Sequence, residues 1–391
     1  MNGNWWPKLL ICIALIPCIV FFGFFVMIYV SLMGGDKFYV PLIATISITL
    51  ILYLIVRLFI PLRPRIINMS LLVLLLIAGL IVTGYEINRA YHNSISTVSE
   101  QGVDVSEYEP FQKNVKIAAL DEPSNLSLEA DLPRLDGATA LYPLYSAFAQ
   151  AVYPGKRYDP YDSEVMVNTT PEAYTNLMTG KVDVIFVAGP SARQLEEAEQ
   201  KGVELKLTPI GREAFVFFVN AENPVKGITT EQIQNIYSGK ITNWDEVGGN
   251  KEKIRPFQRP EGSGSQTMLQ KVMNGKTLMS PPLKDVVSGM GGIIEQTADY
   301  RNYKNALGFS FLYFATEMVQ NGNIRLLEVD GVAPNRNTIS SGEYPLAAEF
   351  YAVTRNDDHP NPNVDQLIEW ILSPQGQELV EKTGYTSISK K

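Results

Sequence analysis

The sequence predicts an α/β protein in which three transmembrane helices precede a domain of two lobes. Two observations lead to this fold class. The first 85 residues contain three long apolar runs without charged residues, and after residue 135 strand patterns alternate with helix patterns. Alternation of this kind is typical of α/β units, for which we expect a mostly parallel sheet, and about 250 residues of it are enough for two lobes.

The apolar runs extend from Leu9 to Met33, from Phe38 to Val56 and from Ile66 to Tyr85. At about 1.5 Å per residue, each is long enough to cross a hydrocarbon core of about 30 Å. A buried helix of a globular domain explains one such run but not three in succession. We therefore predict a three-helix transmembrane anchor at residues 1–87.

Basic residues beside these runs predict the orientation. Lys8 precedes the first run, and Arg57, Arg63 and Arg65 surround the turn after the second, whereas the loop "GGDKF" is charge-balanced. An excess of Lys and Arg marks cytoplasmic loops. We therefore expect a multi-pass protein of the cell membrane, with its N-terminus in the cytoplasm and everything after Glu86 outside the cell.

Two other interpretations of the first run fit less well. A cleavable signal peptide requires a small-residue cleavage site, and none follows the run. The stretch "LIPC" is similar to a lipoprotein acylation site, but the proline before Cys18 argues against it. Both cysteines, Cys12 and Cys18, lie in this run, so the exterior domain contains no cysteine and needs no disulfide framework.

The exterior part is acidic. Residues 1–90 carry six Lys and Arg and two Asp and Glu, so 27 basic and 39 acidic residues remain for the rest, a net charge of −12. Affinity for the phosphate backbone of nucleic acids depends on Lys and Arg. We therefore expect no nucleic-acid partner.

A polar segment rich in turn residues follows the third run, and we assign residues 88–125 to an extracellular stalk or linker. The domain itself occupies residues 126–391. Apolar periodicity predicts helices at residues 139–153, 171–180, 191–202, 229–240, 265–273, 363–372 and 373–384. Apolar and β-branched runs predict strands at residues 163–170, 182–189, 212–221, 253–259, 306–315 and 347–355.

Two of these helices carry recognisable start signals. Thr229 and Gln232 have the spacing of a capping box. Ser373 followed by Pro374 is typical of an N-cap and a first helical position. Both signals support the helix assignments.

The turn "RPEGSGS", which begins at Arg259, joins a predicted strand to a predicted helix. The first N–H groups of a helix have no intrahelical partner, and the helix dipole favours negative charge there. Gly262 and Gly264 allow the backbone to approach a ligand, and Ser263 and Ser265 add hydroxyl donors. Arg259 offers a forked pair of N–H groups. The turn therefore predicts a site for a small tetrahedral anion.

Glu261 lies in the same turn and repels an anion unless that anion carries a proton. A carboxylate accepts a hydrogen bond from HPO4²⁻ or H2PO4⁻, whereas fully ionised sulfate leaves it unpaired. Glu261 therefore predicts a preference for phosphate. A simpler alternative stays open from these residues alone, namely a surface ion pair of Glu261 with Arg259 beside an ordinary glycine turn.

Two further junctions have the same character. In "LDGATALYP" small residues precede a helix at Thr139, and in "VNTTPEAY" Thr169 and Thr170 end a strand. We expect Thr170 to be the N-cap before Pro171. Singly, each junction is typical of an ordinary cap, but three helix N-termini directed at one point form an anion site.

These motifs are similar to those of a known family, the phosphate-binding proteins of high-affinity phosphate ABC importers, which have the type II periplasmic-binding-protein fold. The resemblance covers residues 130–391 and rests on "DGATALYP", "GKVDVIF", "QIQNIYSGKITNWDEVGG", "RPEGSGSQT" and "ALGFSF". It implies two α/β lobes that are joined by a hinge and close around the ligand. We expect one lobe at residues 126–211 and 345–391 and the other at residues 212–344.

The resemblance also implies a phosphate-binding site. Arg259 resembles the family's phosphate arginine, and Glu261 resembles its proton-accepting aspartate. The family's Ser-Gly-Thr falls on Ser263, Gly264 and Ser265.

The other two junctions supply the remaining ligands that the resemblance implies. The first-loop hydroxyl resembles Thr139, with the adjacent N–H of Ala140, and the second-loop hydroxyl falls on Thr169 or Thr170.

Three departures from the family bear on the ligand. Glu261 is longer than aspartate, Ser265 replaces threonine, and the family's second carboxylate has no counterpart in "VIFVAGPS". Anion binding is therefore better supported than selectivity for phosphate, and sulfate, molybdate or tungstate are alternatives. Most family members are lipid-anchored or periplasmic, so the three-helix anchor points to a membrane-tethered receptor of a bacterium without a periplasm.

The resemblance thus implies a solute-binding protein that captures inorganic phosphate outside the cell for an ABC importer permease in the same membrane. An oxyanion sensor or scaffold with the same fold is the alternative. We expect no cofactor and no metal. We also expect no enzyme, since the two histidines are His92 and His359 and the Ser-x-x-Lys spacing of "SISK" lies at the C-terminus, at residues 387–390.

Overall fold

The structure is a computed structural model that divides into two compact units, Met1–Ser94 and Ile95–Lys391. It describes residues 5–32, 36–94, 104–280, 302–318, 323–356 and 361–388.

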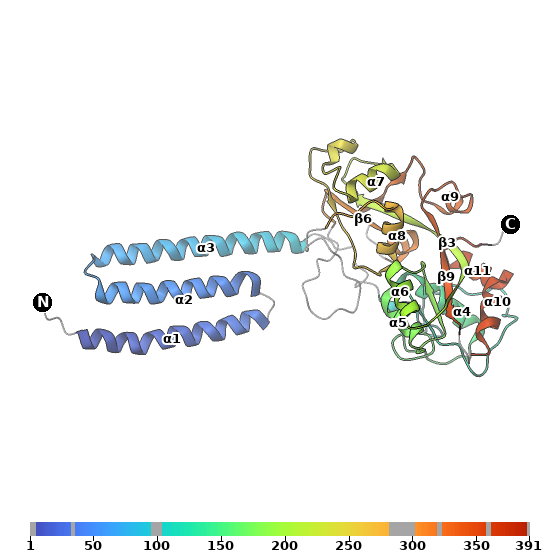
Figure 1. The fold of residues 1–391 in the computed structure, drawn as a ribbon, viewed down its shortest axis with the longest axis horizontal. Helices are drawn as coiled ribbons and strands as arrows, with labels where there is room; N and C mark the ends of the chain where they lie inside the picture. The colour runs from blue at the N-terminus through green and yellow to red at the C-terminus, as the bar shows by residue number, and fades with distance from the viewer. Residues whose placement is uncertain are drawn as a thin grey trace. The chain divides into compact units, whose positions relative to one another are not determined.

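The first unit consists of three long helices, drawn in blue in Figure 1. They are α1 (Trp5–Leu32), α2 (Asp36–Phe59) and α3 (Pro64–Ser94). Their spanning segments have mean hydropathies of 3.0, 2.3 and 2.6, and each helix is long and apolar enough to cross a membrane. The three predicted helices are therefore present, and α3 continues seven residues beyond the predicted end of the anchor.

The second unit is built on a sheet with the strand order β1-β2-β9-β3-β6-β5, and β7 also pairs with β3. These strands are β1 (Leu135–Gly137), β2 (Val184–Val187), β3 (Leu205–Asn220), β5 (Arg255–Pro256), β6 (Ala306–Phe311), β7 (Ile324–Leu326) and β9 (Ala347–Arg355). A separate short pair joins β4 (Gly227–Ile228) to β8 (Glu328–Val329).

Helices cover this sheet at the seven positions that apolar periodicity predicts, and α9 (Arg336–Ser340) is an eighth that it does not predict. The predicted strand at residues 163–170 is wrong, because only an isolated bridge at Val165 forms there. The α-helices are α4 (Tyr142–Val152), α5 (Thr170–Met178), α6 (Ala192–Gln200), α7 (Thr230–Tyr237), α8 (Gly264–Met273), α9 (Arg336–Ser340), α10 (Val364–Leu372) and α11 (Pro374–Thr383). Shorter turns are η2 (Val105–Tyr108), η3 (Thr139–Leu141), η4 (Trp244–Val247) and the π-helical η6 (Phe314–Met318).

Both expected start signals are confirmed. The Thr229 side chain accepts a hydrogen bond from the N–H of Gln232 before α7, and Ser373 caps α11.

The expectation of a mostly parallel sheet is wrong. Pairs β1–β2 and β5–β6 are parallel, but β2–β9, β3–β9, β3–β6 and β3–β7 are antiparallel. All four antiparallel ladders contain β3 or β9, two long strands that run in opposite directions through the middle of the sheet. Figure 1 shows these two strands between the helical layers.

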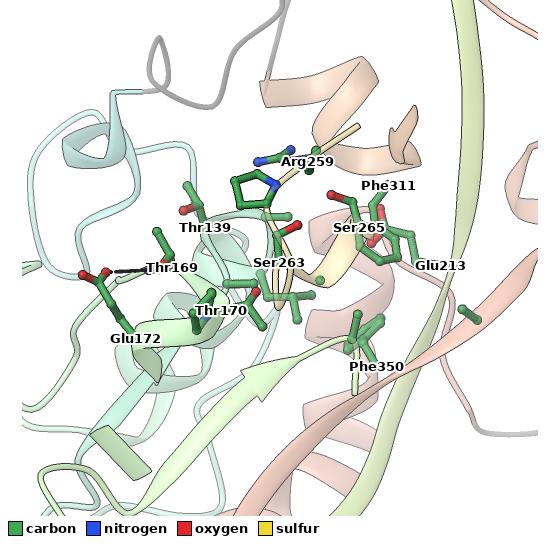
Figure 2. Close-up of a pocket in the computed structure, with 18 of the residues that line it drawn as sticks. Thr139, Thr169, Thr170, Glu172, Glu213, Arg259, Ser263, Ser265, Phe311 and Phe350 are labelled. Carbon is green, nitrogen blue, oxygen red and sulfur yellow. Dashed lines mark hydrogen bonds between the residues drawn. The ribbon is translucent and has the colours of Figure 1, made fainter. Parts of the chain in front are cut away.

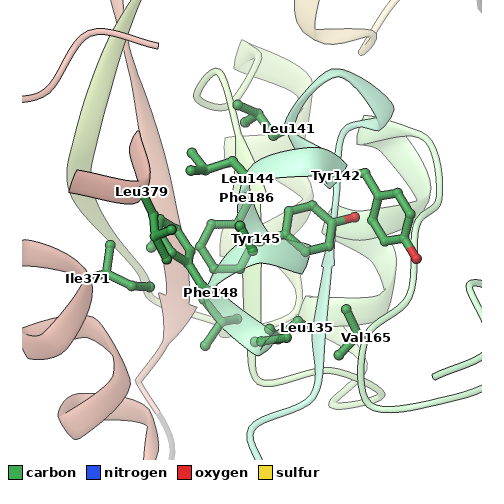
Figure 3. Packing of buried hydrophobic residues seen from close by; sticks show 14 of the residues in the cluster. Leu135, Leu141, Tyr142, Leu144, Tyr145, Phe148, Val165, Phe186, Ile371 and Leu379 are labelled. Atoms are coloured by element: carbon green, nitrogen blue, oxygen red, sulfur yellow. The ribbon is translucent and has the colours of Figure 1, made fainter. Parts of the chain in front are cut away.

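Strand β3 connects two hydrophobic cores. From Leu205 to Ala214 it pairs with β9, and from Phe215 to Val219 it pairs with β6. The first core lies around α4, α10 and α11, where aromatic and aliphatic side chains interlock (Figure 3). The second core lies around α7, α8 and β6.

The segment before β1 packs on the first core. Val105, Tyr108 and Leu128 are buried in it, and residues 88–94 belong to α3. Part of the segment that the sequence assigns to a stalk therefore contributes apolar surface to the domain.

A β-bulge interrupts the pairing of β3 with β9 between Pro209 and Gly211. A Cβ atom on Gly211 would lie 2.3 Å from Cζ of Phe350, a buried ring on β9. The absence of a side chain at Gly211 therefore leaves room for the Phe350 ring.

We expect Gly211→Ala to lower the free energy of unfolding by about 1–3 kcal/mol, because the new methyl group overpacks a buried ring. Gly155→Ala is the matched control, since its added methyl would meet Phe111 at an ordinary 3.7 Å. Urea unfolding of the full chain in detergent measures both. Equal unfolding midpoints for the two variants would contradict the packing described for Phe350.

Candidate functional site

Three turns of the second unit lead into helices at one place. The first turn runs from β1 into η3 and α4, the second precedes α5, and the third connects β5 to α8. All three present the first N–H groups of a helix, which lack intrahelical acceptors. They are therefore the three junctions that the sequence singled out.

The turns surround one cavity of about 290 Å³. This volume is near the lower end of ligand pockets, which span roughly 300–1,000 Å³. Its lining consists of Ala138, Thr139, Ala140, Leu141, Thr169, Thr170, Pro171, Glu172, Ala188, Glu213, Arg259, Pro260, Ser263, Gly264, Ser265, Phe311, Ala348, Glu349 and Phe350. Eight of the nine predicted ligands belong to this lining, and Glu261 does not.

Short distances connect the turns across the cavity. A Cβ on Gly264 would lie 3.4 Å from the hydroxyl oxygen of Thr170, and one on Gly262 would lie 3.6 Å from Cγ of Pro171. The side-chain amide of Gln194, on α6, donates to the carbonyl of Gly262 at 3.1 Å. Figure 2 shows Thr139, Thr170 and Ser263 around the same space, with Arg259 beside them.

The third turn is held by its own side chains. Ser263 is the N-cap of α8 and accepts a hydrogen bond from the N–H of Gln266. The Gln266 side chain in turn accepts one from the N–H of Arg259 at 2.9 Å. Gly262 has φ +83°, a conformation that glycine adopts without strain. These contacts place Arg259, Ser263 and Ser265 together on the cavity wall.

The first and second turns are held by one buried side chain, Asp136 of β1. Its Oδ1 accepts hydrogen bonds from the N–H of Gly137 at 2.8 Å and of Asn168 at 2.9 Å. Its Oδ2 accepts from the side-chain amides of Asn168 at 2.9 Å and Asn176 at 2.8 Å. Burial raises the pKa of Asp136, and these four hydrogen bonds oppose that rise.

Tyr385, which follows α11, also holds the first turn. Its hydroxyl donates to the carbonyl of Ala140, and burial raises the pKa of Tyr385 well above its usual value. The hydroxyl therefore stays protonated and keeps donating.

The cap of α5 differs from the expectation. Thr169, not Thr170, is the N-cap, and the Glu172 carboxylate accepts from its N–H and hydroxyl at 3.3 and 3.2 Å. Pro171 is consequently the second helical residue. Its missing N–H costs no intrahelical hydrogen bond, because the first N–H groups of a helix have no partner within the helix. Both threonines remain in the cavity lining.

Glu261 is not among the residues that line the cavity. Its side chain is exposed, and the turn carries it past the lining residues Pro260 and Ser263. The role of Glu261 as a reader of the ligand's proton stays a prediction, and the lining of the cavity does not include it. The reason is local, because Gly262 turns the backbone at φ +83° immediately after it.

Sequence reasoning missed Glu213, the buried carboxyl of the lining. It is 5% exposed, lies on β3 and accepts a hydrogen bond from the N–H of Tyr313 at 2.6 Å. Burial raises the pKa of Glu213 to about 8, and the hydrogen bond from Tyr313 opposes this. A signal was present, since an acidic residue opens the apolar run "AFVFFV".

The cavity therefore combines anion donors with an unusual acidic content. Arg259 is the basic residue of the described lining, and Glu172, Glu213 and Glu349 are its acidic residues. Helix N–H groups and serine and threonine hydroxyls suit a small oxyanion.

Comparison with known proteins identifies the class. Residues 127–375 match the PBP superfamily domain, so the chain belongs to this superfamily. A structure from Clostridium perfringens, described as a phosphate ABC transporter substrate-binding protein with bound phosphate, has the same fold. It superposes with a TM-score of 0.51 and 23% identity, over 67% of this chain and 100% of that one. The predicted two-lobe α/β fold is thereby confirmed.

Two curated relatives of this chain are both named phosphate-binding protein PstS. The phosphate-binding protein PstS of Borreliella burgdorferi is 27% identical over 240 residues, which are 59% of this chain and 83% of the relative. The phosphate-binding protein PstS of Bacillus subtilis is 27% identical over 260 residues, 65% of this chain and 80% of the relative.

Several residues weighed for catalysis lie outside the described residues. His359 and the lysine end of "SISK" are among them, and so is the side chain of His92. Within the described part of the chain, no group of three His, Cys, Asp or Glu is arranged to hold a metal ion.

We expect Asp136→Asn to lower the free energy of unfolding by about 2–3 kcal/mol. The new amide would direct N–H groups at donors that Asp136 now accepts from, leaving buried groups unsatisfied. Anion affinity should fall as well, because the first two turns lose their common anchor.

The control for this variant is Asp162→Asn, an exposed aspartate of the same domain, which should change stability by less than about 0.5 kcal/mol. Thermal unfolding and anion titration of the full chain in detergent measure both effects. If Asp136→Asn behaved like the control, Asp136 would not be the anchor of the two turns.

Proposed function

We propose that this protein captures inorganic phosphate outside the cell and delivers it to an ABC importer permease in the same membrane. One observation carries the proposal, namely that three helix-start turns and Arg259 line a single small cavity. Unpaired helix N–H groups and a guanidinium stabilise a tetrahedral anion with preformed donors. The relatives named as phosphate-binding proteins support phosphate as that anion.

Each lining residue has a role in this proposal. Arg259 pairs with the anion's charge, and the hydroxyls of Ser263 and Ser265 donate to its oxygens. The N–H groups of Ala140 and Gly264 donate from two helix starts.

Thr139, Thr169 and Thr170 supply the remaining hydroxyls. Glu261 is left out of this ligand set because it lies outside the lining.

We further propose that the domain works as two lobes, residues 126–211 with 345–391 and residues 212–344. Strands β3 and β9 connect them, and closure brings the third turn onto the first two. The hydrogen bond from Gln194 to the carbonyl of Gly262 is the kind of contact that closure forms. Residues 1–87 act as the anchor and residues 88–125 as its connection to the domain.

A second candidate ligand is another tetrahedral oxyanion, such as sulfate, molybdate or tungstate. The exposed position of Glu261 favours it, because the group expected to exclude proton-free anions is absent from the lining. In either case the role proposed is binding and delivery, not catalysis.

We expect the full chain in detergent to bind phosphate in calorimetry, and Arg259→Ala to weaken binding by about 1.5–3 kcal/mol, or roughly 10- to 150-fold. Hydrogen bonds to charged groups contribute this much. Arg193→Ala is the matched control, because Arg193 is 65% exposed and pairs with Glu197. It should bind within twofold of the native protein.

Two outcomes of this titration count against the proposal. Absence of heat with phosphate at any concentration removes the proposed function. Native affinity in Arg259→Ala removes the assigned site. Stronger binding of sulfate, molybdate or tungstate than of phosphate would support the second candidate.

The proposed topology is tested by cysteine labelling in a background in which Cys12 and Cys18 are replaced by alanine. Ser127→Cys, an exposed residue of the domain, should react with a membrane-impermeant maleimide on intact cells. Arg63→Cys, in the turn between α2 and α3, should react only after permeabilisation. The reverse pattern would place the domain in the cytoplasm.

A further inference from the structure

Glu213 is the feature of the cavity that the anion-binding function leaves unexplained. Its side chain is buried, yet it lines a site for a negatively charged ligand. A carboxylate there would repel the ligand inside a region where water screens charge poorly. The question is therefore in which form this carboxyl meets the anion.

The two carboxyl oxygens of Glu213 differ in their hydrogen bonding. Within the described residues, the carboxyl accepts one hydrogen bond, from the N–H of Tyr313 to Oε1. An ionised carboxylate that is removed from water needs several donors or a cation to offset the loss of hydration. One backbone N–H falls short of this requirement.

The surroundings of Glu213 are mostly neutral. Tyr313 and Tyr385 face it from the segments after β6 and α11, and burial raises the pKa of both hydroxyls, so they carry no charge. Phe311 and Phe350 supply apolar lining from β6 and β9. Figure 2 shows Glu213 on the side of the cavity formed by Ser265 and Phe311.

Charged groups near Glu213 complete this picture. Arg259, Glu172 and Glu349 share its cavity, and Arg212 precedes it on β3. The negative charge of Glu317, on η6, contributes to the raised pKa of the Tyr313 hydroxyl. None of these groups is within ion-pair distance of the Glu213 carboxyl among the described residues, so burial decides its protonation. Burial raises the pKa of Glu213 to about 8.

We propose that Glu213 is a hydrogen-bond donor to the bound anion: one carboxyl oxygen accepts from Tyr313, and the other carries a proton that it donates to an anion oxygen. This inference rests on the proposed function, since it specifies how the same cavity holds its ligand. A buried carboxylic acid that donates in this way adds a neutral donor to an anion site. The proton belongs to the protein, so a proton-free oxyanion satisfies Glu213 as well as phosphate does.

Proton linkage follows from this arrangement. A neighbouring anion favours the neutral form and raises the pKa of Glu213 further in the complex. Above pH 8 the free protein loses this proton and must regain it to bind, so affinity falls about tenfold per pH unit until the raised value is reached. Phosphate remains a dianion throughout this range, so its own ionisation does not contribute.

The test compares the native full chain in detergent with Glu213→Gln and Glu213→Leu. Glutamine reproduces the hydrogen bonds of the protonated acid, with a carbonyl for Tyr313 and an N–H for the anion, but it does not titrate. We expect Glu213→Gln to bind phosphate at pH 7 within threefold of native, and Glu213→Leu to bind at least about tenfold more weakly. Glu222→Gln is the control, a 66% exposed carboxylate paired with Lys304.

Calorimetry at pH 9 in buffers of different ionisation enthalpy measures the proton. Native protein and Glu222→Gln should take up close to one proton per phosphate bound, and Glu213→Gln should take up none. Equal uptake by native protein and Glu213→Gln, or no uptake by native protein, would overturn the inference. So would a Glu213→Gln affinity as low as that of Glu213→Leu.

Infrared difference spectra of the native protein provide a test that needs no variant to fold. The carbonyl stretch of a protonated carboxylic acid should persist when phosphate binds at pH 7. Its replacement by carboxylate bands would place the proton on the phosphate and overturn the inference. Failure of the native protein to bind phosphate at pH 7 would overturn the proposed function as well, whereas binding without proton uptake at pH 9 overturns the role of Glu213 alone.

Discussion

The pairing of one long strand with two partners is the constraint on which the domain depends. Strand β3 is hydrogen-bonded to β9 along its first half and to β6 along its second half, so the same backbone belongs to both cores. The point of transfer lies between Ala214 and Phe215, both fully buried. Glu213 lies two residues before Phe215 and pairs with Ala348 in the β3–β9 ladder, so its backbone has a defined place beside the cavity. A side chain on a loop would have no such constraint.

The three turns depend on a second constraint, which is the need of helix starts for acceptors. Asp136 accepts hydrogen bonds from backbone donors of two turns, Gly137 in one and Asn168 in the other. Its carboxylate thereby substitutes for sheet and helix partners that these N–H groups lack. Residues further along these turns, among them Thr139 and Thr170, line the cavity. In the proposed function, a bound anion would accept hydrogen bonds from donors that the fold itself leaves without acceptors.

Local patterns in the sequence predict most of the helices and strands but not how the strands pair. Strand β9 matches its predicted range, and the caps at Thr229 and Ser373 are confirmed, because each depends on residues within four positions of one another. The sheet direction was predicted wrongly, since it depends on pairing between segments more than a hundred residues apart. The same limit explains why the sequence pointed to Glu261 as a ligand-binding carboxyl and missed Glu213. A carboxyl next to Arg259 in the sequence is visible in a motif, whereas one brought to the cavity by a distant strand is not.

The acidic net charge of the domain affects a bound anion less than the charges inside the cavity do. A domain with an excess of acidic residues repels an anion only as far as its field reaches, and at physiological salt that field decays over about 8 Å. Within the cavity the nearest groups are Arg259, the N–H groups of three helix starts and a carboxyl whose pKa burial raises to about 8. If Glu213 were ionised, three lining carboxylates would face one guanidinium, and the donors would have to overcome that excess. A neutral Glu213 removes one negative charge and adds one donor in the same step. The balance of an acidic protein that holds an anion therefore depends on a single buried proton.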